Sequence, residues 1–458
     1  MVSKWAKACS IISATALFLG VSACGSANTN SGGTAEGITA EDVEKALTDD
    51  SKTVELTFWA PSYNAMKASV EAFQKKYPHI KIDFVNPGSS SDFNTKLQNA
   101  ITAKKGVPEV VQFGYDSYGQ FAMTGGLLNF KNDSLEKYLG DKYLYAAWKG
   151  VHLAGGLYAI PQDIAPMVMY VRQDILDQYG LKTPTTWDEF YEIGKQLHEK
   201  NPDLYMSYLE LGQSKYWSNY YREAGAKIWG VGSDTSLSLD FDSDKAKSVD
   251  EFLTKCIRDG VLEPVNSGTD EFNRDMNNGR YASWIDEEWR GNLIRSSFPS
   301  QSGKWKVYQL PSWEKGAKSV TTGAGSVLSV TAATDPSKRA AAIAFADWIN
   351  SSEESIQAFQ DSNNGFFFMA AKSFRDNYGE GEEDPYFGQN VSKLYFEAAD
   401  NINSDWEYLP FGVQLDTMFT DVMAPGLESK EDVATTASKY SDAIKNYAEK
   451  QGFTVTVK

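Results

Sequence analysis

Residues 53–114, TVELTFWAPSYNAMKASVEAFQKKYPHIKIDFVNPGSSSDFNTKLQNAITAKKGVPEVVQFG, decide the fold of this chain. Apolar side chains alternate in three short runs, which predicts strands, and recur every three or four residues in two longer runs, which predicts helices. The strand positions are Val54, Leu56, Phe58, Ile80, Ile82, Phe84, Val110, Val111 and Phe113, and the helix positions are Met66, Val70, Phe73, Tyr77, Phe93, Leu97 and Ile101. Because the connections are short, this order predicts a parallel, doubly wound α/β sheet.

Helix signals continue beyond this stretch. Thr186 and Glu189 have the spacing of a capping box, and Asp335 followed by Pro336 predicts another helix start. The chain has 458 residues, which exceeds one comfortable hydrophobic core, so we expect two domains.

The N-terminus has the pattern of an export signal. A basic start and an apolar run, residues 11–21, lead to Val21-Ser22-Ala23 and then Cys24, which predicts a signal peptide over residues 1–23. A small-residue cleavage site ending on Cys resembles the bacterial lipobox, which implies a lipid on Cys24 and attachment to the outer face of the cell membrane. The alternative is an ordinary secretory signal next to a cysteine. Residues 24–52, rich in small polar side chains and then acidic, predict a flexible tether.

Composition narrows the possible partners. The net charge of −17 argues against a nucleic-acid partner, because phosphate binding needs a basic surface.

After removal of Cys9 and lipidation of Cys24, only Cys256 remains, so no intramolecular disulfide is expected. The helical apolar neighbours of Cys256 predict a core position for it. The three histidines are far apart in sequence and predict no metal site. The 12 Trp and 24 Tyr residues exceed what cores usually need, so some are expected in a ligand site.

Two segments follow strands of the predicted sheet, where ligands bind in doubly wound folds. Tyr63 and Asn64 follow the first strand, and Tyr115 and Asp116 follow the third. An aromatic ring beside a carboxylate or amide suits a sugar, whose C–H groups pack on the ring while hydroxyls donate to the polar group. The alternatives are partly buried packing for the two tyrosines and a helix cap for Asp116.

Several motifs together resemble a known family. They are Pro108-Glu109-Val110-Val111 through Tyr115-Asp116, Tyr118-Gly119, Gly125-Gly126-Leu127-Leu128, Leu157-Tyr158-Ala159-Ile160-Pro161, Tyr170 with Asp174, and Asn278-Gly279-Arg280-Tyr281-Ala282 to Trp289. In order and spacing, over residues 53 to 450, they are similar to the maltose-binding-protein type of solute-binding lipoprotein from carbohydrate ABC importers, extracellular solute-binding protein family 1. The family often has Asn or Asp after the tyrosine at 170, and this chain has Val171.

The resemblance implies two doubly wound α/β lobes joined by a multi-crossing hinge, a periplasmic-binding-protein-like fold of type II. The expected lobes are residues 53–162 plus 320–368 and residues 163–319 plus 369–458, with crossings near 161–166, 318–325 and 366–372. The family's pattern places sugar contacts at Asp116, Asp163, Tyr216, Trp217, Trp289, Trp406 and Tyr408, hydroxyl acceptors at Asp286 and Glu288, and a backbone approach to ligand at Gly325.

The expected function is a lipid-anchored, monomeric receptor that binds an oligosaccharide and delivers it to an ABC permease, with no cofactor, metal or catalysis. Two alternatives remain open. Clustered carboxylates and aromatics would also suit a cation such as a polyamine. Asp286, Glu287 and Glu288 could include the acid of a glycoside hydrolase, because such enzymes pair carboxylates.

Overall fold

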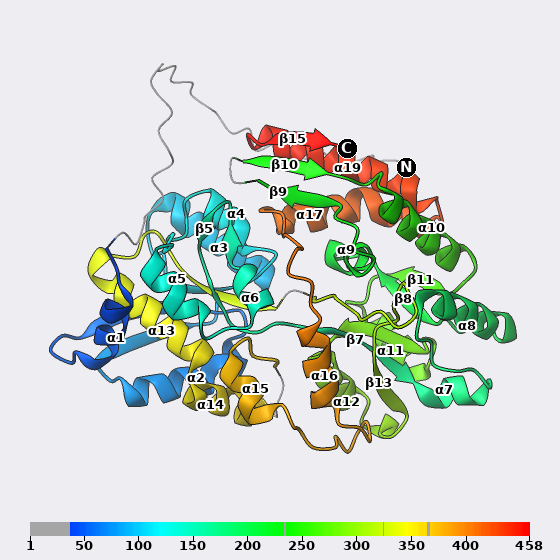
Figure 1. Ribbon diagram of the computed structural model, residues 1–458, viewed down its shortest axis with the longest axis horizontal. Helices are drawn as coiled ribbons and strands as arrows, with labels where there is room; N and C mark the ends of the chain where they lie inside the picture. The colour runs from blue at the N-terminus through cyan, green and yellow to red at the C-terminus, as the bar shows by residue number, and fades with distance from the viewer. Residues whose placement is uncertain (1–36, 233–234, 324, 364–366) are drawn as a thin grey trace, which may run out of the picture. The chain divides into compact units, whose positions relative to one another are not determined.

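The computed structural model describes residues 37–232, 235–323, 325–363 and 367–458 (Figure 1). These residues form one compact unit. Cys24, the predicted signal peptide and the first part of the predicted tether lie outside the described residues. Within the described residues, no helix is both long and apolar enough to cross a membrane.

The first sheet contains the predicted β-α-β-α-β unit. Its elements are β1 (Val54–Trp59), α2 (Tyr63–Lys76), β2 (Ile80–Val85), α3 (Ser90–Ala103) and β3 (Val110–Gly114). β1 pairs in parallel with both β2 and β3, which confirms the predicted parallel arrangement of these three strands. Two later strands, β14 (Ser326–Val330) and β6 (Ile160–Pro161), extend the sheet in antiparallel pairings and give the order β2-β1-β3-β14-β6.

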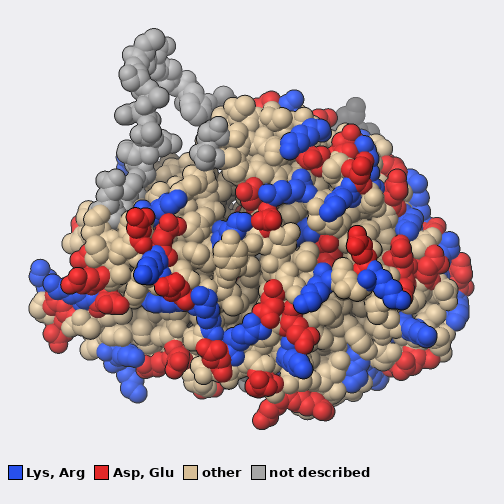
Figure 2. Space-filling view, in the orientation of Figure 1, with Lys and Arg blue, Asp and Glu red and all other residues tan. Residues whose placement is uncertain are grey.

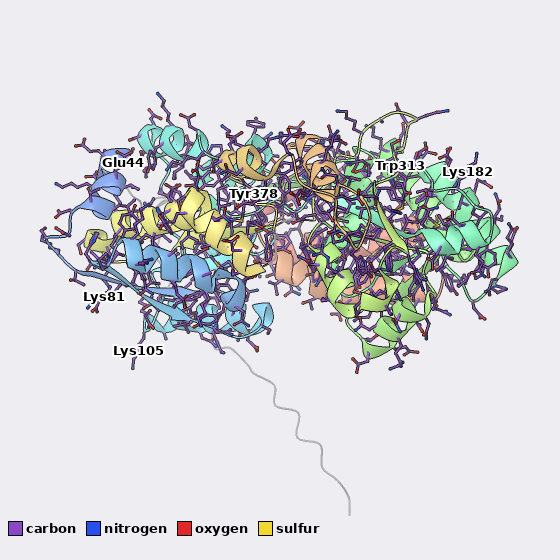
Figure 3. All side chains as sticks on the ribbon, turned by 90° about the horizontal axis from the view of Figure 1, so that it is seen from below. Glu44, Lys81, Lys105, Lys182, Trp313 and Tyr378 are labelled. Carbon is purple, nitrogen blue, oxygen red and sulfur yellow. The ribbon has the colours of Figure 1, made fainter. Side chains whose placement is uncertain are left out.

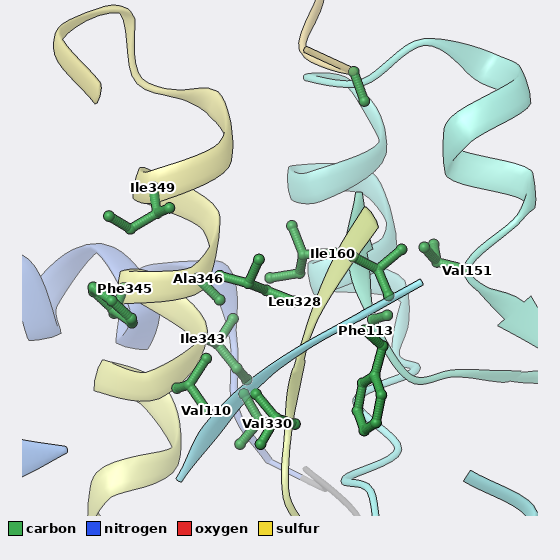
Figure 4. Close-up of a cluster of buried hydrophobic side chains, with 14 of the residues drawn as sticks. Val110, Phe113, Val151, Ile160, Leu328, Val330, Ile343, Phe345, Ala346 and Ile349 are labelled. Atoms are coloured by element: carbon green, nitrogen blue, oxygen red, sulfur yellow. The ribbon is translucent and has the colours of Figure 1, made fainter. Parts of the chain in front are cut away.

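The core of this first lobe lies between the sheet and α13 (Arg339–Ser351), as Figure 4 shows. Ile343 and Ala346 of α13 lie near Leu328 of β14, and Phe345 packs its ring against Phe58 of β1 at a centroid distance of 5.3 Å; all of these side chains are fully buried. Each large apolar side chain buried in this way contributes about 1.5–3 kcal/mol. This packing ties β14 and α13, which come late in the chain, to strands formed near its beginning.

The predicted tether over residues 24–52 is wrong in its last part, because α1 (Ala40–Thr48) is a folded helix. Thr39 caps it through a capping box with Asp42, and Val43 is fully buried in the core of the first lobe. The cap and the apolar spacing of Val43, Ala46 and Leu47 are the signals that the composition of the segment obscured.

The second lobe contains smaller sheets. β7 (Met167–Arg172) pairs antiparallel with β12 (Ser283–Glu287) and β13 (Trp305–Gln309). The parallel pair β8 (Ser207–Glu210) and β11 (Leu262–Val265) lies beside it, and β9 (Trp229–Val231), β10 (Ser236–Leu239) and β15 (Thr454–Val457) form a third sheet. The lobe is α/β, as expected, but its central three strands alternate in direction, which apolar periodicity does not encode.

The remaining helices cover these sheets. They are α4 (Tyr118–Met123), α5 (Asp133–Gly140), α6 (Tyr145–Lys149), α7 (Gln173–Gln178), α8 (Trp187–Lys200), α9 (Ser214–Glu223), α10 (Asp244–Arg258), α11 (Asp270–Asn278), α12 (Arg290–Ser297), α14 (Glu353–Asn363), α15 (Lys372–Tyr378), α16 (Val391–Asp400), α17 (Gly412–Met418), α18 (Ala424–Glu428) and α19 (Val433–Lys450), with the short hairpin β4 (His152–Leu153) and β5 (Gly156–Leu157). Thr186 caps α8, as its spacing predicts, and Cys256 is fully buried on α10, as expected.

Two extended segments, near 161–166 and 318–325, cross between the lobes side by side. The expected third crossing, near 366–372, is wrong: this third segment pairs with the first but continues into α15, whose Phe374 is buried in the core of the first lobe. The first segment is bonded to the second by Gly323 N–H to the Ala165 carbonyl at 2.9 Å, and to the third by Ile164 N–H to the Phe368 carbonyl at 2.9 Å. Gly325 has a φ of 82°, and a Cβ there would lie 2.6 Å from the Asp163 carbonyl oxygen, so this close backbone approach requires glycine. These crossings place the ends of β3, β12 and α9 around one region.

Candidate functional site

A buried ion pair lies where these elements meet. Lys215, in the first turn of α9, places its Nζ 2.7 Å from Oε1 of Glu287 at the end of β12. The Lys215 side chain is 24% exposed and that of Glu287 only 4%. Trp289 donates its indole N–H to the second oxygen of Glu287. On the other side the carboxylate lies against Gly323 of the second crossing, where any Cβ would overlap it.

The charges of this cluster act on one another. Burial raises the pKa of Asp116, while Lys215 lowers it and Glu287 raises it further. Burial lowers the pKa of Lys215, but Glu287, Tyr216 and Asp116 together raise it well above its usual value. Lys215 is therefore a cation held between two carboxylates from different lobes.

The start of α9 has a second acidic contact. Asp416 of α17 accepts the Ser214 backbone N–H at 2.8 Å and the Ser214 hydroxyl at 2.7 Å. Its carboxylate therefore fixes the helix start that presents Lys215. Asp116, Lys215 and Asp416 all line a small cavity of about 30 Å³, together with Trp406 and Tyr408.

A larger crevice of about 320 Å³ adjoins this cavity and shares Trp406 and Tyr408 with it. Its lining includes Tyr115 and Tyr118, which are buried in the first lobe, and the partly exposed Trp406 and Tyr408. The ring centroids of Tyr115 and Tyr408 are 6.1 Å apart. Aromatic rings from both lobes thus face one crevice.

The loop that carries Trp406 is fixed to the second lobe. Glu407 accepts the Trp229 indole N–H on its carbonyl and the Val231 backbone N–H on its carboxylate, each at 2.9 Å. Arg222 donates to the Asn403 carbonyl at 2.8 Å, and its guanidinium lies 5.7 Å from the Trp406 ring centroid. The ring is therefore positioned before any ligand arrives, which reduces the entropy cost of binding.

Aromatic rings can cover the apolar faces of a ligand, and the neighbouring carboxylates and lysine can exchange hydrogen bonds with its polar groups. This combination suits a polar, largely uncharged small molecule. The profile of the family described as bacterial extracellular solute-binding protein matches residues 59–356, well over half of the chain. The chain belongs to this family.

Relatives of this solute-binding protein include an arabinooligosaccharide-binding protein of Halalkalibacterium halodurans, which is 24% identical over 76% of this chain and 79% of its own length. A lactose-binding protein of Rhizobium radiobacter is 26% identical over 55% of this chain and 60% of its own. A similar solved structure is the ABC transporter associated binding protein of B. animalis subsp. lactis Bl-04 in complex with beta-1,6-galactobiose, with a TM-score of 0.73, 24% identity and coverage of 88% of this chain and 100% of that one. These structures share the two-lobed α/β fold of periplasmic binding proteins.

The structure brings part of the predicted set together in this solute-binding protein. Asp116, Tyr115, Trp406 and Tyr408 line the two cavities, and Trp289 contacts the ion pair through Glu287. Tyr63, by contrast, stacks on Phe84 with ring centroids 4.3 Å apart, and Asn64 beside it is exposed.

Trp217 needs a correction, because its side chain is fully buried in the core of the second lobe. Its ring packs against Tyr221, Phe241 and Tyr440, with centroid distances of 4.5, 6.1 and 5.7 Å. Trp217 and Tyr216 both lie inside α9. On this helix face, Trp217 stabilises the lobe and does not face the crevice.

Asp286 is engaged within the second lobe. It accepts the Arg290 guanidinium at 2.6 Å and the Tyr216 hydroxyl at 3.2 Å. Burial raises the pKa of Asp286, while Arg290 lowers it and Glu287 raises it. Its role in this structure is to fix Arg290 and Tyr216.

Asp163 and a residue that sequence reasoning missed, Glu223, hold the crossings. Asp163 accepts the Ser326 N–H at 2.6 Å, and burial raises its pKa to about 6. Glu223 of α9 accepts the Val320 N–H at 3.0 Å and also the Thr321 hydroxyl. Burial raises the pKa of Glu223 to about 7, although these hydrogen bonds lower it.

The sequence reasoning also missed Lys215, Asp416 and the role of Glu287. Lys215 immediately precedes the predicted Tyr216, and Glu287 lies inside the acidic triplet that was singled out, so both were one position from a named candidate. Asp416 had no local signal, because its partner Ser214 is distant in sequence.

Proposed function

We propose that this solute-binding protein is the receptor of an ABC importer and that its ligand is an oligosaccharide. The observation that carries the proposal is the crevice lined by Tyr115, Tyr118, Trp406 and Tyr408. A sugar ring would pack on the partly exposed rings of Trp406 and Tyr408, and hydroxyls would bond to Asp116 in the adjoining cavity. Hydrogen bonds to charged groups contribute about 1.5–3 kcal/mol each. The sugar ligands named for the relatives support this class of ligand.

Binding would act through the crossing segments. A ligand that contacts both lobes favours the arrangement in which they are close, and the crossing segments absorb the hinge motion. The proposed lobes are residues 53–162 plus 320–368 and residues 163–319 plus 369–458, except that α1 and α15 are added to the first, because Val43 and Phe374 are buried in its core. Lys149 and Asp405, both exposed, form a 3.0 Å ion pair across the crevice, which contributes little by itself. The membrane subunits would recognise the closed, loaded receptor.

The proposal includes the cellular setting. As a member of an extracellular family, the protein acts outside the cytoplasm, and Cys24 would carry a lipid that anchors it to the membrane. We also propose a monomer without cofactor or catalytic activity.

Calorimetric and thermal titration with mono- and oligosaccharides tests this function. A sugar present at 100 times its dissociation constant adds about 2.7 kcal/mol to the free energy of unfolding. Trp406→Ala should lose the binding, while the control Tyr145→Ala, at a ring that is 70% exposed outside the crevice, should retain it.

Two results would overturn the proposal. One is the absence of any response to the sugar panel. The other is recovery of cleaved instead of intact glycan, which would identify a hydrolase.

A further inference from the structure

A second cavity, of about 680 Å³, lies among α12, α14, α15, α16 and the loop between α15 and α16. In Figure 1 these helices lie below the crossing segments, whereas α4 and β9, which border the sugar crevice, and α17, which borders the small cavity beside it, lie above them. Of the described residues, none lines both this cavity and the sugar crevice or the small cavity beside it. The cavity is therefore a separate space on the other side of the crossings.

Glu288 lines this cavity with a carboxylate that is only half satisfied. The residue is 4% exposed, and its Oε1 accepts the Phe368 backbone N–H at 3.2 Å. Its Oε2 is buried and has no hydrogen-bond partner among the described residues. A buried carboxylate oxygen without a donor is costly, so a donor arriving through the cavity would be stabilised there.

Aromatic rings form the wall beside Glu288. The Phe368 ring centroid lies 4.4 Å from that of Phe396 and 5.4 Å from that of Phe374, and Phe374 stacks on Tyr378 at 4.9 Å. Figure 3, seen from below, labels Tyr378 on this side of the chain. Ring faces of this kind attract cations and cover alkyl groups.

The entrance is acidic. Glu380, Glu382 and Glu383 are exposed lining residues, and in Figure 2 carboxylates gather along the lower edge, where Figure 1 places this loop. Arg295 also lines the cavity, but its guanidinium is paired with Asp384 at 2.5 Å. The charge that remains at the entrance therefore favours a cation.

We propose that this cavity is a second ligand site, which takes a small organic cation with its ammonium group on Glu288 and its alkyl part against Phe368, Phe374 and Phe396. The inference does not depend on the sugar function. Burial, with Asp163 and Glu287 nearby, raises the pKa of Glu288 well above its usual value, and a bound cation offsets that cost. Phe368, Phe374 and Phe396 belong to the core of the first lobe, whereas Val391 on another wall belongs to the second.

Calorimetry on the whole mature protein tests the site, with n-butylammonium and n-butyltrimethylammonium as probes and n-butanol as the neutral analogue. Ligands of this size bind at about millimolar concentrations. At least one cation should bind and the alcohol should not. Glu288→Gln should weaken the cation at least about tenfold. Glu382→Gln, the same change of charge at the exposed entrance, should weaken it by less than about threefold.

The variant Asp116→Asn, in the small cavity beside the sugar crevice, tests where the cation binds. It should leave the affinity for the cation unchanged. The inference fails if no cation binds, if butanol binds as well as the cations, if Glu288→Gln binds like the natural protein, or if Asp116→Asn removes the binding. Sugar binding is measured on the same samples. Loss of the sugar function with cation binding intact would refute only the proposed receptor role, and the reverse would refute only this second site.

Discussion

Replacement of Lys215 by methionine isolates the ion pair at the centre of the site. The change keeps the length of the side chain and removes its charge, so Glu287 loses its cation and retains the Trp289 N–H as a donor. The Glu287 side chain is only 4% exposed, so water cannot readily replace Lys215. We expect the free energy of unfolding to fall substantially.

The magnitude follows from the geometry. At the observed Nζ–Oε1 distance of 2.7 Å, the Coulomb attraction is about 6 kcal/mol at an effective dielectric constant of about 20. Desolvation of both groups offsets much of it, and loss of one partner of a buried pair typically costs about 3–5 kcal/mol. Because Lys215 is 24% exposed, we expect the lower end, about 3 kcal/mol.

Urea unfolding of Lys215→Met, Glu287→Gln and the double variant forms a double-mutant cycle. The double variant should recover about 2 kcal/mol of the loss, because no charge is left buried alone. Lys149→Met is the matched control, since its pair with Asp405 is exposed, and it should cost no more than about 1 kcal/mol. If Lys215→Met costs no more than Lys149→Met, the pair is effectively solvated and the reasoning about this site is refuted.

Three further predictions concern other parts of the chain. Trp289→Ala should abolish sugar binding in calorimetry and lower the free energy of unfolding by about 1.5–3 kcal/mol, because the buried Glu287 carboxylate loses a donor. Trp217→Ala should cost about 3–5 kcal/mol in urea unfolding because its ring fills a core; sugar binding that survives in Trp289→Ala would remove that ring from the site. The folded-state pKa of Glu223, about 7, lies above the usual 4.5, so its contribution is fully present below pH 4.5 and is lost as pH rises through 7. The free energy of unfolding should therefore decline by about 3 kcal/mol less over that range in Glu223→Gln than in the natural protein, and equal slopes would contradict the assignment. Cys24→Ser should move the protein from the membrane to the soluble fraction on cell fractionation, and continued retention would exclude lipid attachment at that residue.

The first sheet was predictable because its information is local. In residues 53–114 the spacing of apolar residues identifies each strand and each helix separately. The short connections between them then leave few possible arrangements. The second lobe was less predictable, because β7 is buried along its whole length and such a strand carries no alternation that reveals its neighbours or their direction. α1 was missed for another reason, since composition was allowed to outweigh a capping box.

The site residues also differ in how far the local sequence determines their role. A ring in a loop, such as Trp406, can be expected to reach a ligand from sequence alone. A ring on a helix, such as Trp217, can turn to either face, and only the packing of α9 against α19 and Phe241 decides that it belongs to the core. The pair of Lys215 and Glu287 joins residues from two distant elements, so no local pattern could predict it.

The acidic triplet at the end of β12 shows that the partners of neighbouring carboxylates cannot be predicted from the sequence alone. Asp286, Glu287 and Glu288 are consecutive and chemically alike, and the sequence analysis assigned the same role, hydroxyl acceptor, to Asp286 and Glu288. In the folded chain Asp286 is held by Arg290, Glu287 by Lys215, and Glu288 only by a backbone N–H. The first two carboxylates are thereby engaged in the second lobe and the sugar site, while the third keeps one buried oxygen without a partner among the described residues and belongs to the lining of a different cavity. Three adjacent residues thus take three different roles, because side chains at the end of a strand project in different directions. Each side chain then contacts residues of a different element.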